Sequence, residues 1–445
     1  MTHGEILLLM TALFLIFGYM GVPVVFALMA GVLTACLLTP ISMQSMIGQM
    51  FHGIDSEILL AVPFFLLVGE LMTSANVTNR MIALAQTMVG HMRGGLAQVV
   101  TLFSMFFAGI SGSSTADVAV LSRTVAPEMD REGYDRAFTA ALIACASTMA
   151  NLIPPSIMAV VYGAIGNVSI GGLFLAGVAP GIVVGIGLMI YSHFFGPVGM
   201  KKPRASLCEF AAAARASVLP LMIPVIIMGG ILTGWFTPTE AGMIASVYIL
   251  LVIVPLLNPR HIRHLPRDFV YTGLLYSLPL ALVAAASAFG WMLAYLRGPD
   301  IVAGWIETYA GTDGRMIMFL LVLLFIIIGD FMDAVPAIII FMPIIIKLNE
   351  LGNINPLHMG VVIITTLVFG LITPPYGLSL LVASKFVGVQ FSKAMYASLP
   401  IYVVFFVTIG FTVFFPDVVL YLPKLLLPES VGCFKSPTGG YICPP

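Results

Sequence analysis

The residues of this chain that could take part in chemistry lie at four interruptions of otherwise apolar sequence. Two interruptions are short turns rich in Ser, Gly and Asp, and the other two are Pro-Pro pairs with an Asn or a Thr nearby. Hydroxyl, amide, carboxyl and free carbonyl oxygens are the ligands that hard cations such as Na⁺ require. The candidate Na⁺ ligands are therefore Ser111, Gly112, Ser113, Ser114, Asp117, Asn151, Gly329, Asp330, Asp333, Gly370 and Thr373.

Each Pro-Pro pair interrupts the hydrogen bonding of the helix that contains it. Proline has no backbone N–H and blocks the helical bond to the preceding turn, so carbonyl groups near 150–153 lose their helical partners. Beyond such a break, the N-terminus of the next half-helix presents N–H groups and a positive dipole end, which suit a carboxylate. Candidate contacts for a carboxylate are Ser114, Thr115, Arg123, Pro154, Pro155, Met332, Pro374 and Pro375.

Each of these groups also has a purely structural interpretation. Ser and Thr at a hairpin turn commonly cap the next helix, and the same role is open to Asp117 and Asp333, which lie 216 residues apart at matching places. Acids inside a membrane are costly, which favours a functional role for them. Asp330 aligns with Ser114 at this spacing and is either a cation ligand or a cap. Arg123 either faces a carboxylate, pairs internally or extends to the membrane interface.

The interruptions recur in one order about half a chain apart. Pro63 precedes Pro279 by 216 residues, and Pro154 precedes Pro374 by 220. In a membrane protein, a duplicated half with broken helices at matching places is typical of a transporter whose site lies where the two breaks meet.

Composition predicts a membrane protein. Hydrophobic residues make up 60% of the chain and charged residues 9%, against roughly a quarter charged in soluble domains. Apolar runs of about 17–25 residues recur, and each is long enough to cross the hydrocarbon of a lipid bilayer. Glu5–Met20 lacks the flanks of a cleaved signal and is interpreted as a retained first helix. No basic, aromatic-interleaved patch suggests a nucleic-acid partner, and no CxxC pair supports a metal or redox centre.

We predict an all-α fold of two repeats with about ten full spans and two re-entrant hairpins. The first repeat, 1–200, contains spans at about 5–21, 23–39, 57–74 and 170–195, a hairpin at about 95–129 and a broken helix at 137–166.

The second repeat repeats this order. It covers 217–423 and contains spans at about 217–235, 238–257, 270–296 and 393–415, a hairpin at about 316–347 and a broken helix at 357–387. The spans within 5–39 and 217–257 are assigned to a scaffold. Both hairpins and both broken helices are assigned to a moving domain.

Basic residues predict the orientation of these spans. Lys201, Lys202 and Arg204 lie in a linker at 201–216, and the basic cluster within 260–267 follows after two more spans. The positive-inside rule places both clusters in the cytoplasm. Each repeat then has five crossings, so the second enters the membrane from the opposite side and the repeats are inverted. Both termini are expected in the periplasm, with the chain in a bacterial inner membrane.

The last residues, 424–445, are expected to form a loose polar tail. Cys433 and Cys443 lie within it, and they either form a disulfide or remain two free thiols.

Enzyme interpretations find little support in the sequence. Gly109–Gly112 matches the short G-x-S-G pattern of an intramembrane serine protease, but that chemistry needs a histidine base at the same depth. No predicted span has a central histidine. The phosphate-binding pattern G-x-x-x-x-G-K-[ST] is absent, so we expect no ATP hydrolysis by this chain. We predict a protein without catalytic residues.

At the interruptions the sequence resembles the large membrane subunit of tripartite ATP-independent periplasmic (TRAP) transporters, the DctM family. The resemblance covers about 5–423 and is strongest in Pro63–Leu66, Gly69–Met72, Gly109–Asp117, Pro127–Met129, Gly133–Tyr134, Ile153–Ser156 and Tyr162–Gly163.

This resemblance implies a sodium-driven elevator importer of an organic acid, such as a dicarboxylate or sialate. It implies two partners, a small four-helix membrane subunit and a periplasmic substrate-binding protein. One Na⁺ site would combine the Ser111–Ser114 turn with the Asn151 break, and a second would combine the Gly329–Asp333 turn with the Thr373 break. Substrate would bind between the two turns. The alternative is a stand-alone sodium–anion symporter of the same inverted-repeat plan, without a binding protein.

Overall fold

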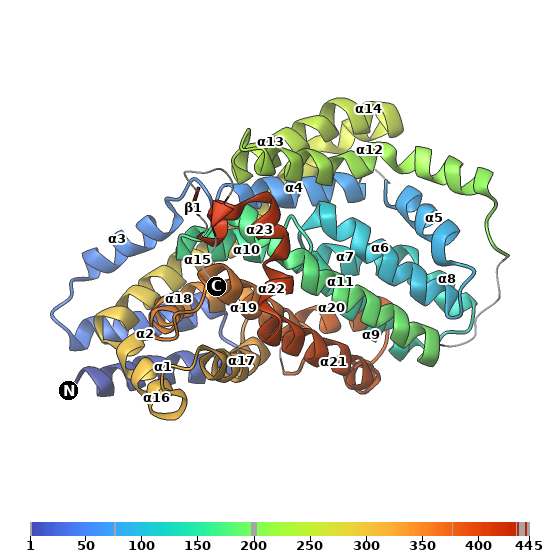
Figure 1. The fold of residues 1–445 in the computed structure, drawn as a ribbon. Helices are drawn as coiled ribbons and strands as arrows, with labels where there is room; N and C mark the ends of the chain where they lie inside the picture. The colour runs from blue at the N-terminus through green and yellow to red at the C-terminus, as the bar shows by residue number, and fades with distance from the viewer. Residues whose placement is uncertain are drawn as a thin grey trace.

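The protein is a helical bundle in which the two halves of the chain interlock (Figure 1). The computed structural model describes residues 2–74, 77–196, 203–375, 377–432, 434–435 and 441–442. The helices of the first half are α1 (His3–Tyr19), α2 (Val24–Leu38), α3 (Met43–Ile54), α4 (Ala61–Ser74), α5 (Thr78–Val89), α6 (Gly95–Ser111), α7 (Ser114–Thr124), α8 (Ala126–Arg131), α9 (Arg136–Ser147), the 3₁₀ turn η1 (Thr148–Asn151), α10 (Ile157–Gly166) and α11 (Ile170–Phe195).

The second half has the same order of long helices, hairpin and broken helix. Its elements are α12 (Leu207–Leu232), α13 (Pro238–Tyr248), the π turn η2 (Ile249–Ile253), α14 (Val254–Leu257), the 3₁₀ turn η3 (Pro259–His264), α15 (Leu265–Tyr295), α16 (Gly298–Ala310), α17 (Gly314–Phe331), α18 (Ala334–Leu351), α19 (Pro356–Gly370), α20 (Leu378–Val387) and α21 (Phe391–Phe414).

The lengths of these helices agree with a multi-pass membrane protein. Seven helical stretches of the described chain are long and apolar enough to cross a membrane, or eight if the pair α4 and α5, bent by 77°, counts as one span. The helices α1 and α2, which the prediction counts as spans, are apolar but have only 17 and 15 residues. The arms α17 and α18 have 18 residues each. Length alone therefore does not limit the second hairpin to half the membrane.

The predicted linker at 201–216 is helical from Leu207 onward, so the prediction is wrong over most of this segment. Helix α12 begins at Leu207, because Ser206 and Glu209 form a reciprocal capping box at its N-terminus. Only a few residues before Ser206 remain as a connection, and Arg204 among them is exposed. Lys201 and Lys202 lie outside the described residues.

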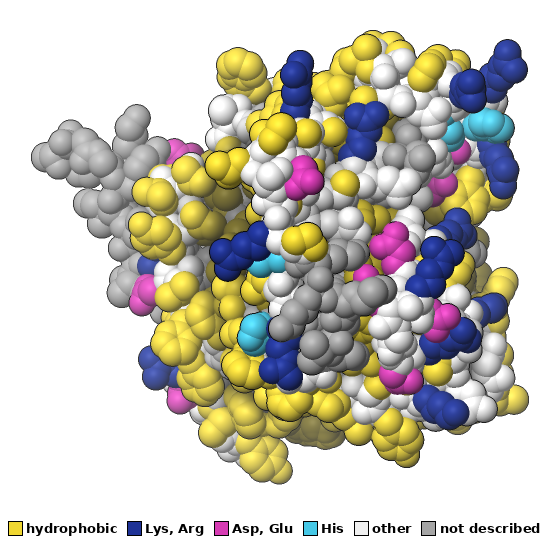
Figure 2. Space-filling model, turned by 90° about the vertical axis from the view of Figure 1, so that its right-hand side faces the viewer, with side chains coloured by type: hydrophobic (Ala, Val, Ile, Leu, Met, Phe, Trp, Pro, Cys, Tyr) yellow, Lys and Arg dark blue, Asp and Glu magenta, His cyan; other side chains and the backbone are white. Residues whose placement is uncertain are grey.

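Basic side chains are spread over one end of the bundle. Figure 2 views the side that faces right in Figure 1, and Lys and Arg side chains outnumber acidic ones on it. The basic residues of the orientation argument that the structure describes, Arg204, Arg260, Arg263 and Arg267, are exposed. So are five further basic residues: Arg93, Arg131, Arg136, Lys385 and Lys393.

The core lies where the hairpins and broken helices meet. Helices α6, α9 and α19 are almost wholly buried, and α9 packs against α20 and α21 of the other half. The second part of each broken helix packs against the hairpin of the other half: α20 packs on α7, and α10 packs on α18. As a result, residues from both hairpins, Ser111–Thr115 and Asp333, line one cavity.

The C-terminal segment is packed up to residue 431, contrary to the expectation of a loose tail from 424. After α21 the chain forms α22 (Pro416–Val419), α23 (Tyr421–Leu426) and the 3₁₀ turn η4 (Pro428–Val431), which lie against α11. Val431 is buried, since its apolar side chain and its carbonyl group both find partners in the bundle. Beyond it, β1 (Phe434–Lys435) pairs with β2 (Tyr441–Ile442). Cys433 and Cys443 lie outside the described residues.

Asn355 holds this segment to the bundle, and its replacement by alanine is expected to destabilise the protein by about 1–2 kcal/mol. Its Oδ1 accepts hydrogen bonds from the N–H groups of Leu357 and His358 at the start of α19, and its Nδ2 donates to the Val431 carbonyl at 3.1 Å. Asn355→Asp keeps the cap and removes only the donor, so its loss should be smaller. Unfolding of the purified protein in detergent measures both. A wild-type stability for Asn355→Ala would contradict the prediction.

Candidate functional site

The first hairpin turn touches the first helix break of the same half. Helix α6 ends at Ser111, Gly112 takes a left-handed conformation (φ 58°), and α7 begins at Ser114. A Cβ atom added at Gly112 would lie 2.6 Å from the Pro155 carbonyl oxygen, so only glycine allows this approach. The turn is therefore packed directly on the Pro-Pro pair, as the hypothesis of a shared site requires.

The first break presents one buried amide without a partner. The Pro154–Pro155 peptide bond is cis, and Ser156 caps α10 through the N–H of Ala159. The Ser156 hydroxyl also donates to the Asn151 carbonyl at 2.6 Å, so this carbonyl is not free as the sequence argument assumes. The Nδ2 of Asn151 is buried and has no hydrogen-bond partner among the described residues. Its side chain, rather than its carbonyl, is available to a ligand.

The second turn and the second break are joined by a hydrogen bond between their predicted site residues. The Thr373 hydroxyl donates to Asp330 Oδ1 at 2.5 Å and also contacts the Phe369 carbonyl oxygen at 3.1 Å. A Cβ atom added at Gly370 would lie 2.6 Å from the backbone of Gly329. The two glycines thus let the turn and the break meet backbone to backbone. Four predicted residues come together here.

The helix caps correct the predicted equivalence of Asp117 and Asp333. Asp333 is the N-cap of α18 and accepts from the N–H of Ala334 at 2.7 Å, whereas the N-cap of α7 is Ser113. Asp333 follows Ser113 by 220 residues, the spacing that also separates Pro374 from Pro154. Equivalent residues of the two hairpin turns are therefore 220 residues apart, and the predicted spacing of 216 is wrong there. The interpretation of Asp333 as a helix cap is confirmed.

Asp117 lies apart from both turn–break contacts. It sits on the first turns of α7, is wholly buried, and lies beside Ser104 of α6 and Ser147 of α9. Neither of its carboxyl oxygens makes a hydrogen bond of good geometry with the described residues. Asp117 does not line the cavity described below. The carboxyl group of Asp117 thus lies against α6 and α9, although its backbone N–H donates to the Ser113 carbonyl at 3.2 Å.

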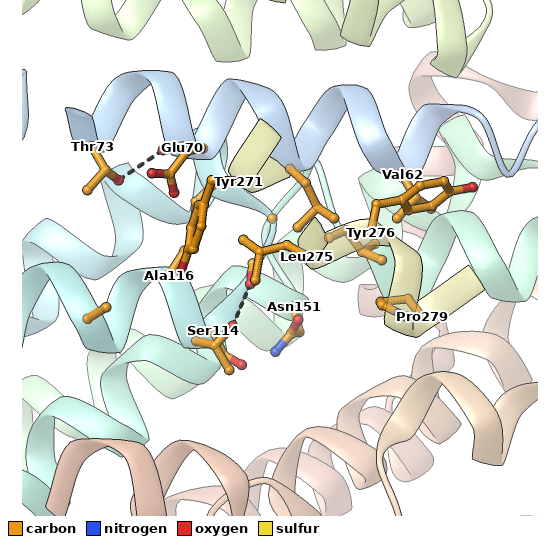
Figure 3. A pocket seen from close by; sticks show the side chains of 18 of the residues that line it. Val62, Glu70, Thr73, Ser114, Ala116, Asn151, Tyr271, Leu275, Tyr276 and Pro279 are labelled. Carbon is orange, nitrogen blue, oxygen red and sulfur yellow. Dashed lines mark hydrogen bonds between the residues drawn. The ribbon is translucent and has the colours of Figure 1, made fainter. Parts of the chain in front are cut away.

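A cavity of about 800 Å³ opens between the first turn and two long helices. Figure 3 shows α4 with Val62, Glu70 and Thr73 along one side, and α15 with Tyr271, Leu275, Tyr276 and Pro279 beside it. Ser114 and Asn151 lie across from them. The predicted site residues that line the cavity are Ser111, Gly112, Ser113, Ser114, Thr115, Arg123, Asn151 and Asp333.

The other predicted residues do not line this cavity. Gly329, Asp330, Gly370 and Thr373 form the second turn–break contact behind it. Five of the candidate carboxylate contacts are likewise not on its wall, namely Pro154, Pro155, Met332, Pro374 and Pro375. The prolines shape the backbone of the breaks, and the wall is built from their neighbours.

Sequence reasoning missed the wall formed by η3 and α15. His261, His264, Arg267 and Asp268 line one end of the cavity, together with Glu70 of α4. The basic cluster within 260–267 indicates the orientation of the chain in the membrane. It does not indicate a cavity wall, because nothing local in the sequence shows that α15 packs against α4. Within this group His261 and Asp268 are buried and share a hydrogen bond, with Nε2 and Oδ2 2.5 Å apart.

Arg123 is placed on the same cavity and stays within reach of a ligand. Its guanidinium lies over the Phe386 ring, 5.2 Å from the ring centroid, a cation–π contact that leaves its N–H donors unused. Arg123 takes part in no ion pair with the described residues. Of the interpretations open for Arg123, internal ion pairing is therefore wrong for the described part of the chain.

The donors at the two turn–break contacts suit a small monovalent cation. They are hydroxyls, an amide and single carboxylates, and the described residues contain no group of three or more His, Cys, Asp and Glu that could hold a metal ion. Oxygen ligands with little fixed charge favour a hard ion of low charge.

Comparison with known proteins shows one family throughout. A family model described as the DctM component of tripartite ATP-independent periplasmic transporters matches residues 9–418. The C4-dicarboxylate TRAP transporter large permease of Pseudomonas aeruginosa is 38% identical over 402 residues, which is 89% of this chain and 93% of that protein. The sialic acid TRAP transporter large permease of Vibrio cholerae is 35% identical over 424 residues, 93% of this chain and 98% of that protein.

Two further matches extend this picture. The 2,3-diketo-L-gulonate TRAP transporter large permease of Escherichia coli is 32% identical over 404 residues, 90% of this chain and 95% of that protein. Among solved structures, the YdaH transporter of Alcanivorax borkumensis has a TM-score of 0.57 at 13% identity and covers 84% of this chain and 87% of its own. That likeness concerns the fold alone.

Proposed function

Because this chain belongs to the tripartite ATP-independent periplasmic (TRAP) transporter family as its large permease, we propose that it is the Na⁺-coupled importer of a small organic acid. It is a multi-pass membrane transporter and not an enzyme. The observation that carries the finer proposal is the pairing of each hairpin turn with a helix break around polar groups. Such pairs suit ions that must be bound without water inside a membrane.

Two Na⁺ sites are proposed at these pairs. The first uses the Ser111–Ser114 turn with the side chain of Asn151, whose Nδ2 lacks a partner and whose Oδ1 can turn to a cation. The second uses Asp330 and Thr373, whose oxygens already meet at 2.5 Å, with the backbone of Gly329 and Gly370 beside them. A cation bound at the second pair would be neutralised by the Asp330 carboxylate.

An organic acid is proposed to bind in the cavity that the first hairpin turn and Asn151 line. Relatives of this chain carry the names of C4-dicarboxylate, sialic acid and 2,3-diketo-L-gulonate transporters, and each of these substrates has a carboxylate. The N-terminus of α7 at Ser114 and Thr115 faces the cavity with free N–H groups. Arg123 adds a cation further along the same helix. A small acid fits within the volume of about 800 Å³.

Movement of the hairpin body against a scaffold is proposed as the transport step. Residues of α4 and α15 line the cavity together with residues of α7, α10 and α20, so the carboxylate would contact walls from different parts of the bundle. The exchange of contacts between α7 and α20 and between α10 and α18 fits two inverted repeats that move as one body. Na⁺ and the acid would support each other's binding, because each helps to order the same turn.

The family is tripartite, and we propose the two other components as a small four-helix membrane subunit and a periplasmic binding protein. The exposed basic end is proposed to face the cytoplasm of a bacterium, with the chain in the inner membrane and both termini in the periplasm. Substrate would then arrive at the opposite end from the binding protein.

Uptake by proteoliposomes tests the proposal. The complete transporter is reconstituted with its small subunit, and labelled succinate, N-acetylneuraminate or 2,3-diketo-L-gulonate is added with the binding protein. We expect uptake only with an inward Na⁺ gradient and only with the binding protein. Equal uptake with a K⁺ gradient would contradict Na⁺ coupling. Uptake without the binding protein would favour the stand-alone symporter.

Ser113→Ala is expected to raise the Na⁺ concentration for half-maximal uptake about three- to tenfold, since one oxygen ligand is worth about 1 kcal/mol. The Ser113 hydroxyl lies on the cavity, 3.0 Å from that of Thr115. Ser277→Ala is the matched control, because this exposed hydroxyl of α15 bonds only to its own helix, at the Leu274 carbonyl. Identical Na⁺ dependence of both variants would remove Ser113 from the site.

A further inference from the structure

Four of the five Asp, Glu, Lys and Arg residues that line the cavity gather at one end of it, and the fifth is Asp333 beside the hairpin turns. Glu70 of α4 lies beside Tyr271 of α15 (Figure 3), and it is within electrostatic reach of Arg123, Arg267 and Asp268, which also line the cavity. The α15 residues toward the other end are apolar or aromatic, and α4 contributes Leu59, Val62 and Leu66 there. An acid leaving the hydroxyl-lined middle of the cavity therefore meets cations in one direction only.

The two arginines at this end are not held in ion pairs with the described residues. Asp268 is committed to His261 through the buried contact of 2.5 Å. Glu70 accepts a hydrogen bond from Ser74 at 3.3 Å and lies within electrostatic reach of both Arg123 and Arg267. Neither arginine forms an ion pair with any residue of the described chain. The N–H donors of both guanidinium groups are therefore open to an anion that enters the cavity.

We propose that Arg123 and Arg267 form a second carboxylate-binding station at the charged end of the cavity, which the substrate occupies as it is released. The proposal rests on the import of an organic acid proposed above and names further residues for it. Arg123 belongs to the hairpin wall and Arg267 to the α15 wall, so they hold the carboxylate from two sides. Guanidinium groups bind carboxylates with paired N–H donors, which gives this station a preference for acids.

Glu70 keeps this station weak. The Glu70 carboxylate, which both arginines attract, competes with the arriving carboxylate for the same donors, and both arginines are exposed and therefore screened by solvent. Weak binding suits a release step, because a tight second site would trap the acid inside the cavity. Glu70→Gln is accordingly expected to strengthen binding at the station.

Exchange measurements separate this station from the main site. Proteoliposomes with equal Na⁺ on both sides are loaded with increasing unlabelled succinate, and entry of labelled succinate from the external binding protein is followed. If the wild type exchanges N-acetylneuraminate but not succinate, N-acetylneuraminate is used on both sides of the membrane. For Arg267→Gln we expect the half-saturating internal concentration to rise about fivefold or more, with the external half-saturating concentration of loaded binding protein unchanged. Arg123→Gln should change the internal value in the same direction, and Glu70→Gln should lower it.

Arg263→Gln is the matched control, because Arg263 lies in η3, is exposed, and does not line the cavity. Arg267→Lys keeps the charge without the paired donors and should give an intermediate value. The proposal is overturned if Arg267→Gln leaves the internal value unchanged, if Arg263→Gln raises it equally, or if internal and external values rise together. If the wild type exchanges the acid but shows no response to a Na⁺ gradient, the proposed Na⁺ coupling is refuted. The comparison of the arginine variants with the wild type still tests the second station.

Discussion

Asp330→Asn is expected to raise the Na⁺ concentration for half-maximal uptake at least about tenfold, or to abolish Na⁺-driven uptake. The Thr373 hydroxyl donates to Asp330 Oδ1 at 2.5 Å, and this pair joins the second hairpin turn to the second helix break. Asparagine keeps an acceptor oxygen and nearly the same shape, but it removes the negative charge that would balance a bound cation. Inside a membrane an unbalanced cation is costly, so the loss falls on ion affinity rather than on the fold.

Thermal unfolding tests this expectation without knowledge of the substrate. A ligand that binds only the folded state stabilises it, and a tenfold loss of affinity removes up to about 1.4 kcal/mol of that effect at high Na⁺. We expect the wild type in detergent to unfold at a higher temperature in NaCl than in equal KCl, and Asp330→Asn to lose most of this difference. The stability in KCl should change little.

Variants of Thr373 provide the control for this pair. Thr373→Ser keeps the hydroxyl that donates to Asp330 and should retain nearly the wild-type response to Na⁺. Thr373→Val removes the hydroxyl, keeps the volume, and should weaken the response. A wild-type Na⁺ response in Asp330→Asn would show that Asp330 acts only through its hydrogen bond to Thr373, and the second ion site would then be lost from the proposal.

Gly370→Ala is expected to destabilise the protein by about 2–4 kcal/mol and to stop transport. A Cβ atom at this position would lie 2.6 Å from the carbonyl carbon and oxygen of Gly329, and backbone atoms cannot move aside as a flexible side chain does. Helices α17 and α19 would have to separate at their ends. That separation would pull Thr373 away from Asp330, so stability and ion binding should fall together.

Two other glycine-to-alanine variants test whether the effect of Gly370→Ala comes from the close backbone contact. Gly329→Ala is expected to be milder, because its added Cβ atom would lie 3.3 Å from the Gly370 Cα atom and 3.6 Å from the Leu367 side chain. Gly410→Ala, within α21, meets nothing within 4 Å and should leave the protein unchanged or slightly more stable. Equal effects of Gly370→Ala and Gly410→Ala would show that the close backbone contact is not needed.

In each half a hairpin turn packs against a helix break, but the polar groups at the two contacts differ. In the first half, the turn carries hydroxyls, and Gly112 rests on the Pro155 carbonyl oxygen. In the second half, the turn carries Asp330, and Gly329 rests on Gly370. A cation at the first pair would have no carboxylate ligand in its turn, while one at the second pair would. We therefore expect the two sites to differ in Na⁺ affinity, and the Ser113 and Asp330 variants to change different phases of a Na⁺ titration.

The local features of this protein follow from its sequence alone. Apolar runs, prolines and capping residues act over a few residues, so they predict the helices, the two hairpin turns and the two breaks close to where the structure has them. The motifs at the interruptions also resemble one transporter family, and the comparison with known permeases confirms that family. The membrane location follows in the same way, because the cost of placing polar groups in hydrocarbon is already visible in composition.

Tertiary structure alone decided which of these features meet. The turns align at a spacing of 220 residues, which makes Ser113 rather than Asp117 the counterpart of Asp333. Asp117 is withdrawn into the core between α6 and α9, and Arg267 of α15 comes to face Arg123 across the cavity. Such contacts join residues more than a hundred positions apart in the chain or depend on a single turn of register. They are set by how whole helices pack against one another, and no local propensity or spacing of side chains contains that information.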